Sequence, residues 1–242
     1  MQKRMLDLPT THILTRVDKT DEHWIIKLEK NGVAFKSGQY VTVGVNGLER
    51  PYSIVSAPDE PFIELFLERV PPPEGQLTPV LYELHPGATV TMRPRAKGLF
   101  TMEMNYPNQL MVSTVTGIAP FVSMLRHYLS HGLKGNKFAV LHGGSFQNEL
   151  VYGDEIQMMQ VEHPDLVRYV PSVSRPNDDR NKGWVGDTGR VNALLGAYIE
   201  SLQLKADNTI IYVCGHPGMI EDVKEKFMTK GWKVKEERYW KD

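Results

Sequence analysis

The sequence predicts two domains of different class: an all-β antiparallel Greek-key barrel over residues 1–104, and an α/β domain with a parallel five-stranded sheet over residues 105–242. Two observations predict them. Up to about residue 104, short apolar runs alternate with turn residues, whereas from residue 108 strand-like runs alternate with helical patterns. The chain of 242 residues is long enough for two hydrophobic cores. The segment 102–109 is the expected boundary.

Six short runs predict the strands of the first domain, because apolar residues repeat in them with the period of a strand. The runs are "HILTRV" (12–17), "HWIIKLE" (23–29), "QYVTVGV" (39–45), "PYSIVS" (51–56), "FIELFLERV" (62–70) and "TVTMRP" (89–94). One helical pattern, "LTPVLYELH" (77–85), interrupts them. There we expect Thr78 as the N-cap and Pro79 as the first helical residue.

The second domain alternates strands and helices. Strands are expected at 110–114, 138–142, 167–174 and 209–214, with a last one at 233–240. Helices are expected after Gly117, Glu149, Arg190 and Met219. Such alternation predicts a parallel sheet with helices on both faces, and ligands of these sheets bind beyond the carboxyl ends of the strands where the strand order reverses.

Composition and charge exclude several classes of protein. A net charge of −1 argues against a nucleic-acid binder driven by bulk charge. The single cysteine, Cys214, excludes a disulfide framework and a Cys-rich zinc or iron–sulfur site, and we expect no metal. The start lacks the apolar core of a signal peptide and no apolar run approaches 18 residues, so we expect a soluble protein of the cytoplasm that does not bind membranes. We also expect a monomer.

In the first domain, the stretch "RPYSIVSAP" (50–58) and the loop "ERVPPPEGQLTP" (68–79) carry unusual residues. Arg50 and Tyr52 share one face of a strand, where the guanidinium needs an anion and the ring a flat partner. The alternative is an arginine paired with a surface carboxylate beside a half-buried tyrosine. In the loop, a phosphate could bind the backbone donors of Gln76, Leu77 and Thr78, although a rigid surface loop fits equally well.

In the second domain, four strand or helix ends stand out. A strand runs into Thr116 and Gly117 before a helix, and the unpaired backbone N–H groups of such a helix start favour an anion. The other three ends are "VSRP" (173–176), "GDTGRV" (186–191) and "YVCGHPGM" (212–219). Two arginines at such ends can converge on one phosphate. Separately, each motif fits a plain turn, a solvated arginine or a buried cysteine.

Taken in order, the motifs "SGQYVTV", "RPYSIVS", "GQLTP", "TGIAPF", "VSR", "TGRV", "CGHPGMI" and "ERYW" resemble the ferredoxin–NADP⁺ reductase superfamily. The bacterial ferredoxin (flavodoxin)–NADP⁺ reductases are the most similar branch. The resemblance implies an FAD-binding barrel followed by an NADP-binding α/β domain, and it spans almost the whole chain.

The resemblance also implies roles for single residues toward FAD. Arg50 would hold the pyrophosphate, Tyr52 would lie against the isoalloxazine ring, and Ser53 would lie within hydrogen-bonding reach of flavin N5. The backbone of Gly75, Gln76, Leu77 and Thr78 would complete the pyrophosphate site. Tyr239 would shield the second flavin face, and Trp240 would stack on an adenine.

Toward NADP, the resemblance places Thr116 near flavin and nicotinamide, with Gly117 in the same turn. Cys214 and Gly215 would border the nicotinamide. The adenosine 2′-phosphate would be bound by Ser174, Arg175 and Arg190. Ser53, Thr116, Cys214 and Tyr239 are therefore the expected catalytic residues, with no general acid–base pair required.

The chain departs from the family pattern at Pro176 directly after Arg175, at the two residues that follow Trp240, and in two further places. Val115 stands where the family usually has glycine, so a β-branched side chain occupies a position of close backbone approach. The segment "LHGGSF" (141–146) lacks an arginine that members of this branch often carry.

These observations predict a reductase that transfers hydride between NADP(H) and FAD and single electrons between FAD and a ferredoxin or flavodoxin. The alternatives are an NADH-dependent flavoprotein reductase component feeding an oxygenase or larger complex, and a flavin-bearing interaction subunit with little activity of its own.

Overall fold

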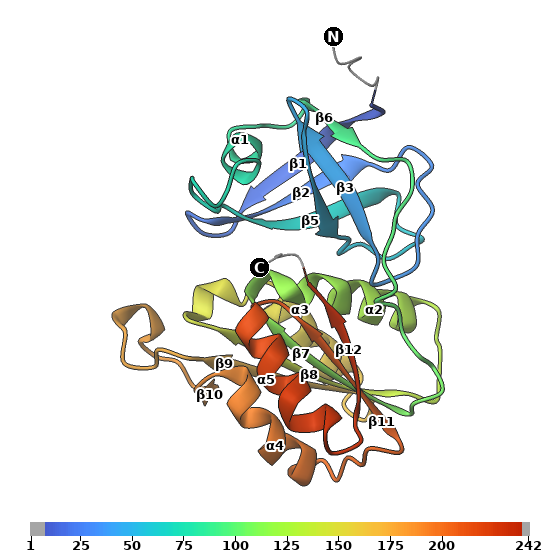
Figure 1. Cartoon of the computed structure of the whole chain (residues 1–242), viewed down its shortest axis with the longest axis vertical. Helices are drawn as coiled ribbons and strands as arrows, with labels where there is room; N and C mark the ends of the chain where they lie inside the picture. Colours follow the sequence, from blue (N-terminus) through green and yellow to red (C-terminus); the bar gives the residue numbers. More distant parts are fainter. Residues whose placement is uncertain (1–7, 239–242) are drawn as a thin grey trace. The chain divides into compact units, whose positions relative to one another are not determined.

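The structure is a computed structural model that describes residues 8–238, and it divides into two compact units, Met1–Thr101 and Met102–Asp242. Figure 1 shows the chain coloured along its sequence. Tyr239 and Trp240 lie outside the described residues. None of the helices within residues 8–238 is both long and apolar enough to cross a membrane.

The first unit is one antiparallel sheet in the order β4-β3-β6-β1-β2-β5. Its strands are β1 (Thr10–Asp18), β2 (His23–Glu29), β3 (Tyr40–Val45), β4 (Leu48–Ser53), β5 (Phe62–Glu68) and β6 (Thr89–Met92). The two ends of the sheet meet at one isolated bridge, Ile54 to Leu65, so the sheet is barrel-like but not closed. The predicted antiparallel β-domain is confirmed.

Alternation along the strands builds the core of this unit. In β2, Trp24, Ile26 and Leu28 point inward and are fully buried, while Ile25 and Lys27 between them are half-buried. Ile63, Leu65 and Leu67 of β5 belong to the same apolar cluster. The period-two pattern of the sequence therefore corresponds to the inner face of the sheet.

The short helix α1 (Thr78–Tyr82) differs from its prediction at both ends. The N-cap is Leu77, not Thr78, and the helix stops before residue 85. Thr78 cannot cap because its hydroxyl bonds the backbone of Val70, 3.0 Å from the nitrogen and 3.3 Å from the oxygen. The hydroxyl therefore ties the start of α1 to Val70, two residues beyond β5.

The second unit is a fully parallel sheet in the order β10-β9-β8-β7-β11-β12. Its strands are β7 (Asn108–Thr114), β8 (Lys137–Gly144), β9 (Val167–Val173), β10 (Asp187–Thr188), β11 (Thr209–Cys214) and β12 (Lys233–Glu237). The α/β class is confirmed, with the two-residue β10 added at one edge of the five expected strands.

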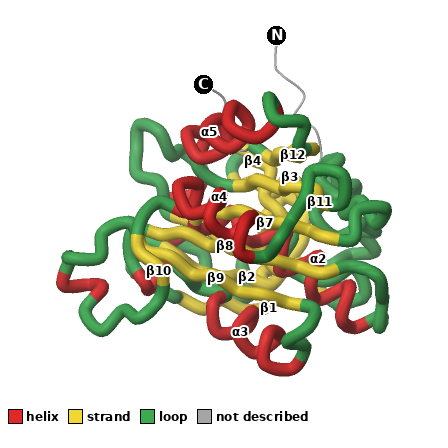
Figure 2. Tube along the Cα trace, turned by 90° about the horizontal axis from the view of Figure 1, so that it is seen from below, coloured by secondary structure: helices red, strands yellow, loops and turns green. Residues whose placement is uncertain are grey.

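Helices cover both faces of this sheet. They are α2 (Ala119–Ser130), α3 (Gly153–Glu162), α4 (Val191–Ser201) and α5 (Pro217–Met228), with single 3₁₀ turns at Val115–Ile118, Gln147–Glu149 and Asp179–Asn181. Figure 2 shows α4 and α5 on one side of the strands and α3 on the other. The last helix begins at Pro217, earlier than the position after Met219 that the sequence predicts.

The core under α4 and α5 takes alternate residues of the strands. Val112, Leu141 and Val170 pack there against Leu195 of α4 and Val223 of α5. The intervening strand residues therefore point to the opposite face, toward α2 and α3. At the carboxyl edge of the sheet, the strand residues therefore fall into two groups, one that faces α4 and α5 and one that faces α2 and α3.

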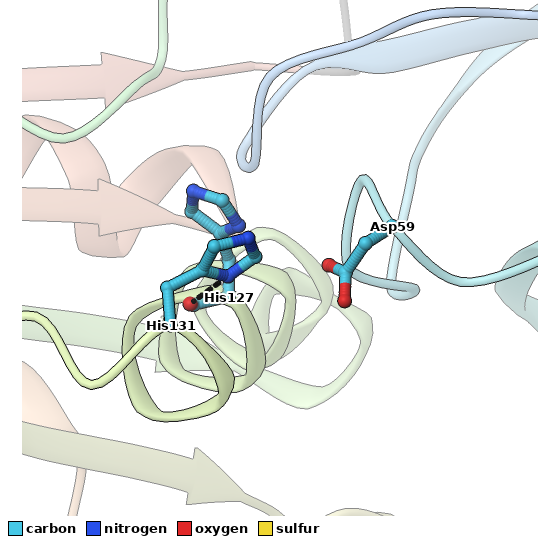
Figure 3. Close-up of side chains that lie close together, drawn as sticks. All are labelled: Asp59, His127 and His131. Carbon is cyan, nitrogen blue, oxygen red and sulfur yellow. Dashed lines mark hydrogen bonds between the residues drawn. The ribbon is translucent and has the colours of Figure 1, made fainter.

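Helix α2 ends in a turn that carries two imidazoles. The rings of His127 and His131 lie with centroids 4.3 Å apart, and His131 Nδ1 is 3.0 Å from the backbone oxygen of His127 (Figure 3). A protonated Nδ1 donates to this carbonyl, which also accepts from the backbone nitrogen of His131 at 3.3 Å. The side chain of His131 therefore adds a second hydrogen bond at the C-terminal end of the helix.

Candidate functional site

The strand order of the second unit reverses between the neighbouring strands β7 and β11. Strand β7 ends at Thr114, and Val115, Thr116 and Gly117 lie beyond it; Gly215 lies beyond β11. The structure thus brings the predicted residues Thr116, Gly117, Cys214 and Gly215 to one edge of the sheet, at its switch point.

The two segments touch backbone to backbone, which requires their glycines. A Cβ on Gly117 would lie 2.2 Å from the carbonyl oxygen of Cys214. A Cβ on Gly215, whose φ is +130°, would lie 2.2 Å from Thr114 Oγ1. That same hydroxyl oxygen accepts a 2.8 Å hydrogen bond from the backbone nitrogen of His216. The backbone of the turn after β7 therefore packs directly against the backbone of the turn after β11.

Val115 adopts a left-handed backbone conformation in this turn, with φ +45°. A β-branched residue rarely takes this conformation, because its Cβ crowds the neighbouring backbone. The position thus has the backbone of a glycine although the side chain is valine. It begins the 3₁₀ turn Val115–Ile118, which leads directly into α2 with Pro120 in its first turn, as predicted.

A row of reactive side chains crosses the sheet at the same edge. The strand register aligns His142 of β8, Ser113 of β7, Cys214 of β11 and Glu237 of β12. Residues paired across parallel strands share a face, and this row lies on the face toward α2 and α3. His142, Ser113 and Cys214 are fully buried.

Glu237, at the end of this row, was not predicted. Burial raises the pKa of its carboxyl from 4.5 to about 7, so it titrates near neutral pH. It aligns with Cys214 in the register of β11 and β12. Sequence reasoning could not find Glu237, because the alignment depends on the register of two strands far apart in the chain.

Ser174, Arg175 and Arg190 come together at the carboxyl end of β9. The backbone nitrogen of Ser174 donates to the oxygen of Gly144 at the end of β8, over 2.9 Å. The nitrogen of Gly189 donates to Val173 over 2.9 Å, which brings Arg190 next to Ser174. Arg190 is the N-cap of α4, and both arginines are exposed.

Phe146 and Arg180 extend this basic cluster and were not predicted. The guanidinium carbon of Arg180 lies 3.4 Å from the centroid of the Phe146 ring, and that of Arg175 lies 5.3 Å from it. Arg180 also makes two hydrogen bonds to the Asp178 carboxylate, of 2.9 and 3.0 Å. The side-chain hydrogen bond of Arg180 lowers the pKa of Asp178 to about 2, so this carboxylate is charged at neutral pH.

A buried asparagine anchors the long polar loop that carries these groups. Asn181 donates to the backbone oxygens of Ser145 at 2.9 Å and Arg175 at 2.8 Å, and it accepts from the nitrogen of Gln147 at 2.8 Å. Its side chain is 2% exposed. The loop 174–183 is thereby fixed to the end of β8.

In the first unit, Arg50, Tyr52 and Ser53 follow one another along β4, an edge strand. Arg50 is exposed and donates to the backbone oxygen of Glu49 at 2.8 Å. The carboxylate of Glu49 is held by Arg93 instead, with contacts of 2.6 to 3.2 Å. Within residues 8–238, Arg50 forms no ion pair.

Tyr52 rests on the apolar core, and its hydroxyl is buried with no hydrogen-bond partner in the described part of the chain. Burial raises the pKa of this phenol well above its usual 10.0. An orphaned buried hydroxyl costs free energy, so it marks a place where a polar partner is missing. The neighbouring Ser53 is 7% exposed.

The loop before α1 presents free backbone donors. The N–H groups of Gln76, Leu77 and Thr78 make no hydrogen bond to any residue between 8 and 238. Gly75 is required there, because a Cβ would lie 1.8 Å from the oxygen of Val70. The loop is therefore folded tightly at Gly75, directly before these three donors.

Comparison with known proteins agrees with this arrangement. Residues 111–225 match the model of the oxidoreductase NAD-binding domain. A ferredoxin–NADP reductase of Pseudomonas aeruginosa is 30% identical, over 95% of this chain and 93% of the relative. Ferredoxin–NADP reductase B of Sorangium cellulosum is 32% identical, over 79% of this chain and 78% of the relative.

The fold is shared with a solved structure of a ferredoxin–NADP⁺ reductase from Neisseria gonorrhoeae, which holds FAD and NADP. The TM-score is 0.83 at 22% identity, covering 96% of this chain and 99% of that one. The chain belongs to the ferredoxin–NADP⁺ reductase superfamily.

Proposed function

We propose that this chain holds FAD and transfers hydride between NADP(H) and the flavin, with single electrons passing between the flavin and a ferredoxin or flavodoxin. The observation that carries the proposal is that each unit presents polar groups suited to bind a nucleotide. The first unit offers an unpaired arginine, an orphaned tyrosine hydroxyl and three free backbone donors. The second offers two exposed arginines at the carboxyl edge of the sheet, the edge that also carries the switch-point turn.

The residues of the first unit fit a flavin nucleotide. The guanidinium of Arg50 and the N–H groups of Gln76, Leu77 and Thr78 are donors suited to the two charges of a pyrophosphate. Tyr52 would present its ring to the isoalloxazine, and its buried hydroxyl would gain a polar partner. When bound, the flavin would exchange hydride as an electron pair and single electrons in turn.

Ser53 would donate its hydroxyl hydrogen bond to flavin N5. It is buried beside Tyr52, so this donor would act where little water competes. Tyr239 and Trp240 remain proposals of the same kind, as the aromatic groups on the second flavin face and on an adenine.

The residues of the second unit fit NADP(H). Arg175 and Arg190 would grip the adenosine 2′-phosphate, with Ser174 as a further donor. Thr116 and Gly117, at the start of α2, would face the nicotinamide half of the nucleotide, and Cys214 and Gly215 would border its ring.

Hydride transfer requires no proton shuttle, so the task of these residues is to orient and to exclude water. The fully buried Cys214 supplies an apolar wall at the strand end. Glu237 is beside it in the register, and burial raises the pKa of its carboxyl to about 7. We propose that it sets the pH dependence of this half-reaction.

The variant Arg175→Ala tests the proposed nucleotide preference. We expect kcat/KM for NADPH to fall by an amount worth about 1–3 kcal/mol, with NADH nearly unchanged, because only NADPH carries the 2′-phosphate. Steady-state kinetics with both nucleotides and a panel of electron acceptors measures this.

Arg168→Ala is the matched control, since Arg168 is an exposed arginine near the amino end of the same strand β9. Equal losses with NADH and NADPH in Arg175→Ala would overturn the 2′-phosphate assignment. A wild-type protein that prefers NADH would instead support a reductase component of an oxygenase or larger complex.

The proposal also covers the setting in which the enzyme works. We propose a monomer in the cytoplasm that uses a small one-electron carrier and binds neither nucleic acid nor membrane. Sedimentation of the flavin-loaded protein with and without a ferredoxin or a flavodoxin tests its mass and its choice of carrier.

A further inference from the structure

Val115 holds the least favourable backbone conformation of the switch-point edge. Its φ of +45° is strained in a β-branched residue, whereas glycine adopts it freely. Such a conformation persists only when surrounding contacts hold it. The question is which contact does so.

His142 makes that contact. Its Nε2 lies 3.1 Å from the backbone oxygen of Val115, and its Nδ1 lies 3.2 Å from the hydroxyl of Tyr169. A carbonyl can only accept, so Nε2 carries the hydrogen and Nδ1 accepts from the tyrosine hydroxyl. His142 is fully buried.

The surroundings of this imidazole keep it neutral, as the two hydrogen bonds require. Desolvation lowers the pKa of His142 from 6.5 to about 4, against the hydrogen bond to Val115, which acts in the opposite direction. Tyr169 is also buried, at 6% exposed, and it packs against α3, where a Cβ on Gly153 would lie 3.0 Å from its hydroxyl. The relay from Tyr169 through His142 to Val115 is therefore rigid.

A shift of the Val115 backbone would displace the residues on either side of it, Thr114 and Gly117. Thr114, before it, accepts the hydrogen bond from the backbone of His216. Gly117, after it, lies against the carbonyl of Cys214 with no space for a Cβ. A relaxed Val115 would thus shift the residues that the proposed function assigns to the nicotinamide nucleotide.

We infer that His142 is a positioning residue for the pyridine nucleotide: its hydrogen bond to the Val115 carbonyl holds the left-handed backbone of Val115, and with it the turn 115–117, in the conformation that binds NADP(H). The inference rests on the proposed function. His142 does not touch the nucleotide, and it acts through the turn.

A purely structural role for His142 makes a different prediction. If the imidazole only fills the core, its removal costs the same whatever residue stands at position 115. If it holds a strained turn, its removal matters less once glycine stands there, because glycine adopts positive φ without being held. The coupling between the two positions therefore separates the two roles.

The experiment is a double-mutant cycle with Val115→Gly and His142→Ala in the flavin-loaded protein, read by calorimetric binding of NADP⁺. We expect His142→Ala to weaken NADP⁺ binding about tenfold when Val115 is present, as is usual for a lost buried hydrogen bond and released strain. In the Val115→Gly background we expect a loss of less than about threefold. Equal losses in both backgrounds would overturn the inference.

Three further variants, the last of them a control, test whether the effect on NADP⁺ binding comes from the hydrogen bonds of His142. His142→Gln keeps an N–H donor of similar reach and should restore most of the affinity. Tyr169→Phe breaks the relay at its outer end and should weaken binding when Val115 is present but not in the Val115→Gly background. If the His142→Ala protein does not fold, Tyr169→Phe takes its place in the double-mutant cycle.

Tyr128→Phe is the matched control, because this buried hydroxyl accepts a 3.0 Å hydrogen bond from the nitrogen of Asn136 before β8, at the opposite edge of the sheet. It should leave NADP⁺ binding unchanged. A wild-type protein that does not bind NADP⁺ would refute the proposed function itself, whereas binding without coupling would refute only the role of His142.

Discussion

At the scale of single residues, the account depends on groups whose ordinary partners are absent or already engaged. Arg50 is the clearest case, because the nearest carboxylate, Glu49, is bound by Arg93. The alternative that Arg50 pairs with a surface carboxylate is therefore not seen among the described residues. The hydroxyl of Tyr52, two residues on, is likewise buried with no hydrogen-bond partner among residues 8–238.

Arg50→Ala should release FAD without unfolding the first unit. Loss of a charge-assisted contact to a phosphate should weaken FAD binding about 10- to 100-fold, while the melting temperature of the flavin-free protein stays unchanged. Flavin absorbance after dialysis and thermal melting measure the two effects. Lys19→Ala, an exposed lysine between β1 and β2, is the charge-matched control. Full flavin occupancy with early melting would favour a structural role for Arg50.

His142 should make the protein less stable in acid. The pKa of His142 is about 4 in the folded protein and 6.5 in the unfolded chain, so the unfolded chain binds more protons between these values. The free energy of unfolding should therefore fall as pH drops from 6.5 to 4, by up to about 3 kcal/mol from this group.

Urea unfolding of wild type and His142→Gln at several pH values between 4 and 7 measures this contribution. Glu237 acts in the opposite direction over the same range, because its folded pKa of about 7 exceeds 4.5, but it is common to both proteins and cancels. Identical pH slopes for the two proteins would contradict a neutral buried imidazole.

At the scale of elements, local sequence signals predict where strands and helices lie better than they predict which side chains cap them. Alternating apolar residues predict β1 to β6, and the "TGIAP" turn predicts the start of α2. The N-cap at Thr78 fails because a tertiary hydrogen bond to Val70 engages its hydroxyl. A contact between residues of different elements has no trace in local sequence.

The loop 174–183 shows the same limit and yields a prediction. Its sequence reads as a polar surface loop, yet Asn181 anchors it with three hydrogen bonds to backbone. Asn181→Ala should lower the free energy of unfolding by about 1–3 kcal/mol, because buried backbone groups lose their partners.

Because Asn181 holds the carbonyl of Arg175, the same variant should also raise KM for NADPH more than for NADH. Thermal melting together with kinetics on both nucleotides checks the two effects. Asn192→Ala on α4, whose side chain donates to Asp222 at 2.7 Å, is a control for a lost amide elsewhere. Unchanged melting and unchanged KM would mean that the loop does not depend on this anchor.

At the scale of the whole molecule, the order of motifs along the chain predicts both fold classes and the family, because each motif falls at a strand or helix end. The register between two paired strands cannot be predicted from the sequence of either strand alone. The row of His142, Ser113, Cys214 and Glu237 could therefore be seen only in the folded sheet. The same holds for the basic cluster around Phe146, whose members come from two different loops.

The most direct test of the central claim is the visible spectrum of the purified protein before and after anaerobic addition of NADPH, and separately of NADH. The account predicts a bound flavin whose absorbance bleaches rapidly with NADPH and slowly with NADH. A protein that purifies and reconstitutes without flavin, or whose flavin is not reduced by either nucleotide, would contradict it.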